Sequence, residues 1–182
     1  MRRFFHFLSL FSVLILAACG GTSTIQKVES SSSPEQSQPA SAAAVSQQPE
    51  EEEKGPEIFA MGDTVQYDEL LITLNGVRTS EGDTFLTPDN DFFLILDLTI
   101  ENTGTEPEVV SSLMQMSLFD ADSYSYNPTF FTDTKGSVDG EVAPGRKMRG
   151  EIVFDVPASE YYEFVFEDPF TTGQAIWRFQ VE

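Results

Sequence analysis

The side chains that most often perform covalent chemistry are scarce in this sequence. It contains one cysteine, Cys19, and one histidine, His6, among 182 residues. Both lie near the amino terminus, so a domain built from the remaining residues has neither a thiol nor an imidazole. Nucleophilic catalysis by Ser-His-Asp or Cys-His arrangements is therefore excluded, as are the usual zinc and copper ligand sets. We expect no catalytic residue, no metal site and no cofactor.

The residues before Cys19 follow the order of a secretory signal peptide. Arg2 and Arg3 supply positive charge, and a mostly apolar run from Phe4 to Leu16 comes next. This run is shorter than the ~20 residues that span a bilayer, which favours a cleavable segment. It ends in a motif of small residues around the cysteine, Leu16-Ala17-Ala18-Cys19-Gly20. The motif resembles the lipobox of bacterial lipoproteins.

The lipobox resemblance implies that residues 1–18 are removed and that the Cys19 thiol carries a diacylglyceryl group. Two or more acyl chains hold a protein on a membrane, whereas a single chain binds only marginally. The expected location is the extracytoplasmic face of the cell membrane, with the lipid on Cys19 as the membrane contact. An uncleaved anchor helix with a chance cysteine is one alternative. Export by the twin-arginine route is a second, although His6 and Phe7 follow where that pattern requires Leu-Lys.

The charge of the chain argues against polyanionic partners. Thirty Asp and Glu residues stand against ten Lys and Arg, for a net charge of −20, and loss of Arg2 and Arg3 makes the mature chain more negative still. Nucleic-acid binding depends on phosphate neutralisation, so no nucleic-acid partner is expected, and docking on anionic headgroups is opposed. Arg146, Lys147 and Arg149 form one basic cluster, which is interpreted as a solvated turn, with an anion contact as the alternative.

Two acidic clusters could in principle hold a cation. Asp120 and Asp122 resemble the start of a calcium loop, but the Gly and Glu that an EF-hand requires at its sixth and twelfth positions are missing. Residues 89–91 form a second oxygen-rich cluster, Asp-Asn-Asp. Turns favour these residue types. We expect both clusters to be polar turns, with a weak calcium site as the alternative.

Four aromatic residues in one segment are the candidates for an interaction surface. They lie between a predicted strand and the next turn signals: Tyr124, Tyr126, Phe130 and Phe131. Aromatic side chains on loops supply contact area at low entropic cost. The alternative is that they cover the open end of the domain.

The elements that must position these residues are predicted to be β-strands. Apolar residues alternate with polar ones around residues 70–74, 92–101, 114–118, 152–156, 162–166 and 177–181. Such alternation is typical of half-buried antiparallel strands. Turn signals separate them, including Asn75-Gly76, Asn102-Thr103-Gly104, Pro144-Gly145 and Asp168-Pro169. No stretch has a convincing helical stripe, so the pattern predicts an all-β, two-sheet antiparallel sandwich.

The chain divides into three parts. After the signal peptide, residues 19–56 comprise the lipidated cysteine and a stretch rich in Ser, Gln, Pro and Glu. This stretch has too few apolar residues to fold and is predicted to be a disordered linker. Residues 57–182 are predicted to form one domain.

The domain resembles a known family. The residues that carry the resemblance are an apolar strand ending in Asn102-Thr103-Gly104, and a later Pro144-Gly145 followed by Gly150-Glu151-Ile152-Val153-Phe154-Asp155-Val156-Pro157. Together with Met61-Gly62-Asp63 and Leu118-Phe119-Asp120, they resemble the telokin-like domain of bacterial lipoproteins and secreted proteins known as domain of unknown function 4352. The resemblance implies an immunoglobulin-like β-sandwich and no established chemistry.

These observations predict a membrane-anchored, non-catalytic interaction module whose protein or cell-envelope partner is unidentified. The alternative is a ligand- or cation-binding lipoprotein serving a membrane system. A carboxylate enzyme is a third option, because 30 acidic residues will bring some pairs together by chance. Function must be argued from a site and not from the fold.

Overall fold

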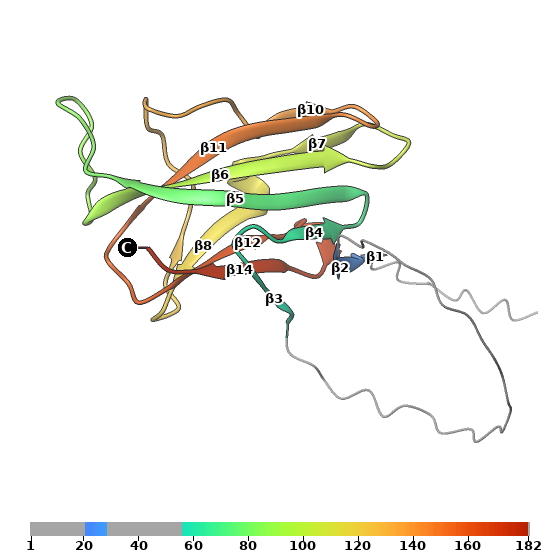
Figure 1. The fold of residues 1–182 in the computed structure, drawn as a ribbon, viewed down its shortest axis with the longest axis horizontal. Helices are drawn as coiled ribbons and strands as arrows, with labels where there is room; N and C mark the ends of the chain where they lie inside the picture. The colour runs from blue at the N-terminus through green and yellow to red at the C-terminus, as the bar shows by residue number, and fades with distance from the viewer. Residues whose placement is uncertain (1–20, 29–55, 182) are drawn as a thin grey trace, which may run out of the picture.

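The computed structural model of the protein describes residues 21–28 and 56–181 (Figure 1). Most of the ordered elements are β-strands stacked in two layers. The predicted signal peptide, Cys19 and residues 29–55 of the predicted linker lie outside the described residues.

The two layers are five-stranded sheets. The first has the order β11 (Lys147–Val156), β6 (Phe92–Asn102), β5 (Leu70–Ser80), β4 (Thr64–Tyr67) and β2 (Ile25–Lys27). The second has the order β3 (Ile58–Ala60), β14 (Ala175–Phe179), β12 (Tyr162–Phe166), β8 (Met116–Asp120) and β9 (Ser125–Tyr126). Smaller pairs join β1 (Gly21–Thr22) to β13 (Thr171–Thr172) and β7 (Glu108–Val110) to β10 (Gly140–Val142), and α1 (Ser112–Gln115) is a single helical turn.

The core lies between the two sheets, as the alternation of apolar residues predicts. On β6, Leu94, Leu96 and Leu98 are fully buried, and Asp97 between them is not. The second sheet contributes large aromatic side chains, and the rings of Phe164 and Trp177 lie 5.5 Å apart. The predicted all-β sandwich is confirmed. Its pairs are antiparallel except β3–β14 and β1–β13, which are parallel.

A smaller core lies on the outer face of the first sheet. Phe93, Ile95 and Val153 are buried there beneath Phe131, with Leu86 packed against them. The rings of Phe93 and Phe131 are 4.7 Å apart. The chain between β9 and β10 therefore covers part of the sheet that would otherwise expose apolar side chains.

This covering segment crosses the edge strand β11 at very close range. Isolated bridges join Thr129 to Val153 and Gly136 to Gly150. A Cβ atom at Gly150 would lie 2.5 Å from the Ser137 backbone, which is closer than any real contact. Glycine at this position is what allows the crossing.

The turn predicted at Asn75-Gly76 is wrong. Both residues lie inside β5, where the pairing with β6 shifts between Leu74 and Gly76. The extra residue forms a β-bulge. The Asn75 amide then donates to Asp97 Oδ1 at 3.2 Å and to Thr99 Oγ1 at 2.9 Å. A dipeptide that usually closes hairpins here bends a long strand.

The strand predicted over residues 114–118 begins two residues late. Met114 belongs to α1 and is 59% exposed. The N–H groups of Met114 and Gln115 both donate to the Ser111 carbonyl, and the Gln115 side chain accepts from the Ser111 N–H at 2.8 Å. These local bonds close one helical turn before β8 starts.

The predicted linker is also wrong for residues 21–28. β1 pairs with β13, and β2 extends the first sheet beside β4. Ile25 packs against the main core, and Lys27 forms an ion pair of 2.9 Å with Asp63. An edge strand offers unpaired backbone groups to any extended segment. A polar segment can therefore join the sheet without a strong hydrophobic pattern.

Asn102 explains why the Asn-Thr-Gly motif follows β6. Its side chain is fully buried and donates to the carbonyls of Glu106 and Val142 at 2.7 and 2.8 Å. Its Oδ1 accepts from the Gly104 N–H at 2.8 Å. Its backbone exchanges bonds with Gly145 and Arg146. One residue thus joins three segments at this end of the sandwich.

Candidate functional site

The four candidate interaction residues do not form one surface. Tyr124 and Phe130 are 66% and 73% exposed. Phe131, by contrast, is 4% exposed and covers Phe93 in the smaller core. Tyr126 is partly buried against the main core. The expectation of exposure is therefore wrong for Phe131, because the segment that carries it folds back over β11.

Asp120 organises the turn that presents Tyr124. Its Oδ1 accepts from the N–H groups of Asp122 and Tyr124 at 3.0 and 2.9 Å, and its Oδ2 accepts from the Tyr126 hydroxyl at 2.8 Å. Burial, together with this bond, raises the pKa of Tyr126 to about 12. Both carboxylate oxygens are thus engaged within the turn. The polar-turn interpretation of Asp120 agrees with this geometry.

An open depression of about 570 Å³ lies beside this turn. Tyr124 and Tyr126 line one side, and residues 157–160 line the other. The Ser159 hydroxyl accepts from the Ala121 N–H and donates to the Tyr161 carbonyl, both at 3.0 Å. Three polar side chains around the depression, those of Asp120, Tyr126 and Ser159, are thus bonded within the protein.

Residues 89–91 likewise form a turn. The Asp155 carboxylate accepts from the N–H groups of Asp89 and Asn90 at 2.6 and 2.9 Å. Asp91 Oδ2 accepts from the Ala158 N–H at 2.8 Å. The Asp155 and Asp91 carboxylates therefore join the turn at residues 89–91 to the segment around residues 155–158. Within the described ranges, no group of three or more His, Cys, Asp or Glu side chains is arranged to hold a metal ion.

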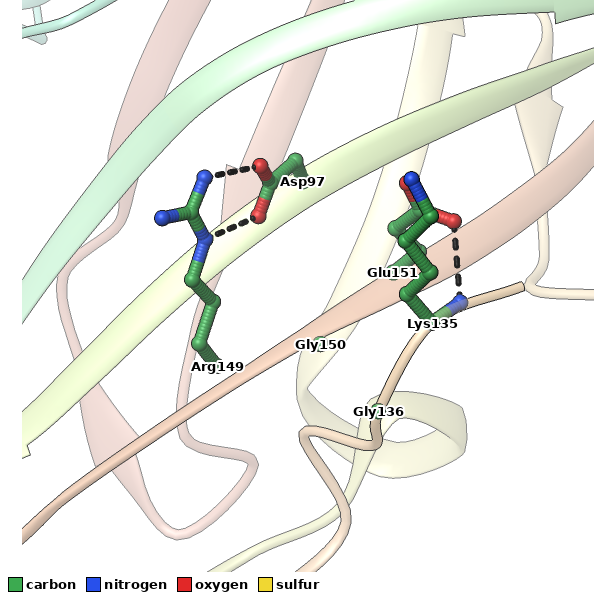
Figure 2. A pocket seen from close by; sticks show the side chains of 6 residues that line it. All are labelled: Asp97, Lys135, Gly136, Arg149, Gly150 and Glu151. Carbon is green, nitrogen blue, oxygen red and sulfur yellow. Dashed lines mark hydrogen bonds and ion pairs between the residues drawn. The ribbon is translucent and has the colours of Figure 1, made fainter.

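A charged pocket of about 340 Å³ lies where the covering segment meets β11 (Figure 2). Arg149 faces Asp97 from the neighbouring strand and donates through Nε at 2.9 Å and through Nη2. These bonds hold the pKa of Asp97 below its ordinary value, against the opposing effect of burial. The Lys135 side chain, also in the pocket, forms no ion pair with any described residue.

Glu151 closes the other side of this pocket. It accepts from Arg78 Nη2 and from the Lys135 backbone N–H, both at 3.0 Å. The Arg78 bond lowers the pKa of Glu151 below its ordinary value. The Glu151 side chain is only 10% exposed. Its bond to the Lys135 N–H joins the covering segment to the sheet.

The predicted basic cluster is largely neutralised within the sheet. Arg149 pairs with Asp97, and Lys147 pairs with Glu101 at 3.1 Å. Arg146 contributes its carbonyl to the Asn102 N–H. Two of the three cations thus already have carboxylate partners, which favours the structural interpretation over an anion contact.

A third depression, of about 240 Å³, lies beneath Phe130. Ser112 and Asp139 also line it, and they are joined by bonds of 2.7 and 3.1 Å. Leu113 directly follows Ser112 and is 73% exposed. Val109, in β7, and Met114, in α1, add further exposed apolar side chains nearby in the sequence.

Sequence reasoning missed these apolar residues. The alternation around residues 114–118 predicts a buried Met114 on a strand, because alternate side chains of a strand face the core, and it does not include Leu113. The signal that could have identified them is the pair Ser111 and Ser112 before Leu-Met-Gln, because serine favours helix starts. Phe170, 82% exposed after the Asp168-Pro169 turn signal, was missed as well.

Cys19 lies outside the described residues, so its predicted lipidation stays a prediction. Among residues 21–28 and 56–181, no helix is long and apolar enough to span a membrane.

Several solved structures share this fold. The ycdA protein of Bacillus subtilis, named as a candidate lipoprotein, is 17% identical with a TM-score of 0.53; the match covers 62% of this chain and 37% of that one. The yjhA protein of the same species is 20% identical with a TM-score of 0.54, over 67% and 99% of the two chains. A β-sandwich protein of Clostridium difficile is 16% identical with a TM-score of 0.50, over 73% and 100%.

At these identities the likeness shows the fold alone. No curated protein matches the chain. Residues 59–176 match the sequence profile of DUF4352, described as a domain of unknown function. The match spans both sheets and includes the Asn-Thr-Gly and Pro-Gly motifs that Asn102 joins. The chain therefore belongs to the DUF4352 family.

Proposed function

We propose that this protein is an extracytoplasmic lipoprotein, anchored through Cys19, whose sandwich acts as a non-catalytic interaction module. The location is supported by the order of charge, apolar run, small residues and cysteine at the amino terminus. It is also supported by the name of ycdA, which designates that protein as a candidate lipoprotein.

The observation that carries the interaction role is a group of exposed apolar side chains near α1. Leu113 and Phe130 are each 73% exposed, and Val109 and Met114 are 67% and 59% exposed. Ser112, beside Leu113, lines the same depression as Phe130. Apolar side chains that are exposed near one another can mark interaction sites, and aromatic anchors often dominate the binding energy of such sites. We name these four residues the α1 surface.

The acidic residues near the depressions support a non-catalytic role. General acid–base chemistry requires a carboxylate within reach of the substrate proton. Asp120 instead bonds within its turn, while Asp97 and Glu151 bond to arginines. These three carboxylates therefore stabilise the fold through hydrogen bonds and ion pairs.

The test compares capture by three forms of the chain that begins at Gly20 and lacks lipid. The forms are unaltered, Phe130→Ser and Phe85→Ser. Phe85 is a matched control, because it is 93% exposed but lies in the loop between β5 and β6. We expect an envelope protein that the unaltered and Phe85→Ser forms bind and the Phe130→Ser form loses. Equal binding by all three forms would contradict the role of the α1 surface.

The alternative, a ligand-binding lipoprotein, is favoured by one observation, the pocket of Figure 2. Two cations, Lys135 and Arg149, and two carboxylates, Asp97 and Glu151, line it, so a small zwitterion would meet charges of both signs. Calorimetry with small envelope metabolites and calcium tests this role. Heat from a metabolite that Lys135→Ala abolishes would support binding in this pocket, and flat titrations with the metabolites and with calcium would exclude the ligand-binding role.

A further inference from the structure

The amino-terminal strands set how the sandwich can lie on a membrane. Gly21 pairs with Thr171, and the Ser23 N–H donates to the Thr172 carbonyl at 2.8 Å. Ser23 is 8% exposed, and its hydroxyl lies 2.6 Å from Thr171 Oγ1. The segment is thus joined to the domain at Gly21 and again at Ser23.

The other half of this segment is fixed as well. The Asp68 N–H donates to the Thr24 carbonyl at 2.9 Å, and the Thr24 N–H donates to Asp68 Oδ1 at 2.7 Å. The Val28 N–H donates to the Thr64 carbonyl at 3.0 Å. Tyr67 of β4, the strand that pairs with β2, donates its hydroxyl to the Gly173 carbonyl at 3.2 Å. Residues 21–28 are part of the sandwich.

Covalent geometry then limits the distance to the proposed lipid. Only Gly20 separates Cys19 from Gly21. Two peptide links reach at most about 7 Å between Cα atoms. If Cys19 carries the lipid, the end of the sandwich where β1 meets β13 must lie at the bilayer surface. The linker predicted from composition over residues 19–56 therefore does not separate the sandwich from the lipid, because residues 21–28 already belong to the sandwich.

That end of the sandwich presents an exposed aromatic side chain. The Phe170 N–H donates to Asp168 Oδ1 at 2.7 Å, and the Thr171 N–H donates to the Asp168 carbonyl at 3.2 Å. These bonds form a turn with Pro169 and Phe170 at its tip, and Phe170 is 82% exposed. Phe170 directly precedes the residue that pairs with Gly21.

We propose that this end of the sandwich rests on the lipid surface, with Phe170 inserted among the headgroups beside the acyl chains of Cys19. The proposal rests on the anchoring proposed above and names the face that the anchor presents to the membrane. Phenylalanine is among the apolar residues that proteins lying on a membrane bury at the boundary between headgroups and acyl chains.

Charge at this end selects the kind of lipid surface. Four carboxylates gather here: Asp68, Glu69, Glu108 and Asp168. The pKa of Glu108 is raised above its ordinary value, first by burial and then by the negative charge of the other three. Such a group is repelled by anionic headgroups. The contact therefore depends on the covalent lipid and on Phe170, and it fits a zwitterionic surface better than an anionic one.

The test uses the full protein purified from membranes and placed in phosphatidylcholine vesicles. Cys19 is the only cysteine and its thiol is taken up by lipid, so one added cysteine gives one labelling site. Phe170→Cys and the matched control Phe85→Cys, both at highly exposed phenylalanines, receive the fluorophore NBD. Figure 1 places β1 and the loop after β5 at opposite ends of the sandwich.

We expect a blue-shifted emission at position 170 and reduction by dithionite that is severalfold slower than at position 85. Adding Ser23→Pro removes the N–H that joins the segment to Thr172, so the chain should stay on the vesicles while position 170 loses its protection. Equal accessibility of the two probes on vesicle-bound, lipidated protein would overturn the orientation alone. Absence of lipid on Cys19, read from the mass of the same sample, would overturn the anchoring and the orientation together.

Discussion

Asn102→Ala gives a direct test of how the family motif holds the sandwich together. The substitution removes three hydrogen bonds, to the carbonyls of Glu106 and Val142 and from the Gly104 N–H. Val142 is 2% exposed, so water cannot replace the bond to its carbonyl. An orphaned buried group costs about 1–3 kcal/mol, and each of the other bonds contributes about 0.5–1.5 kcal/mol. We expect a loss of about 2–6 kcal/mol in the free energy of unfolding.

Urea unfolding of the chain that begins at Gly20 measures this loss. Asn75→Ala is the matched control, because Asn75 also donates two side-chain bonds but is exposed on the outer face of β5. Its loss should stay below about 1 kcal/mol, as for most exposed sites. If both variants lose the same stability, the assignment of Asn102 as a buried junction is wrong.

Three further predictions concern the covering segment and the Asp120 turn. Gly150→Ala should lower stability by about 1–3 kcal/mol in thermal unfolding, because the added Cβ would overlap the Ser137 backbone. Gly76→Ala is the control and should be nearly neutral, because a Cβ at Gly76 would have no atom within 4 Å. Equal effects of the two substitutions would refute the close crossing at Gly150. Since the pKa of Glu151 is held below its ordinary 4.5, the native state binds fewer protons than the unfolded state, and stability should fall as the pH drops below that value. In urea titrations Glu151→Gln should flatten this fall, and an unchanged slope would contradict the ion pair. Tyr126→Phe should lower the melting temperature through a loss of about 1–2 kcal/mol, and an unchanged melting temperature would show that the bond to Asp120 is unimportant.

The alternation of side chains predicts long strands of both sheets, including β6 and β12, but it does not identify the short strands β3, β4 and β9. Leu94, Leu96 and Leu98 are buried because successive residues of a strand point to opposite faces. The same rule does not predict which residues on the outer face of a sheet are buried by another segment of the chain. Phe93 and Ile95 form the smaller core only because a distant segment folds over them.

The amino-terminal strands were beyond the reach of side-chain patterns. Ser23, Thr24 and Lys27 have the composition of a linker, and their attachment is mainly through backbone bonds and one ion pair. Backbone groups are the same in every residue, so the choice of this edge depends on tertiary structure. Ile25 is the one residue of these strands that packs against the main core, and a single apolar residue gives no alternating pattern in the sequence.

The candidate site was only partly predictable for a related reason. Tyr124 and Phe130 are exposed, whereas Tyr126 and Phe131 turn toward the domain. Their directions depend on the hydrogen bonds of Asp120 and on the crossing that Gly136 and Gly150 permit. Neither is visible in the spacing of aromatic residues.

We propose that lipid on Cys19 anchors this sandwich to a membrane. Mass spectrometry of the amino-terminal peptide from the protein isolated from its own cells tests it most directly. We predict a chain that begins at Cys19 and carries a diacylglyceryl group on the thiol. A chain that begins at Met1, or a free thiol at Cys19, would contradict the account.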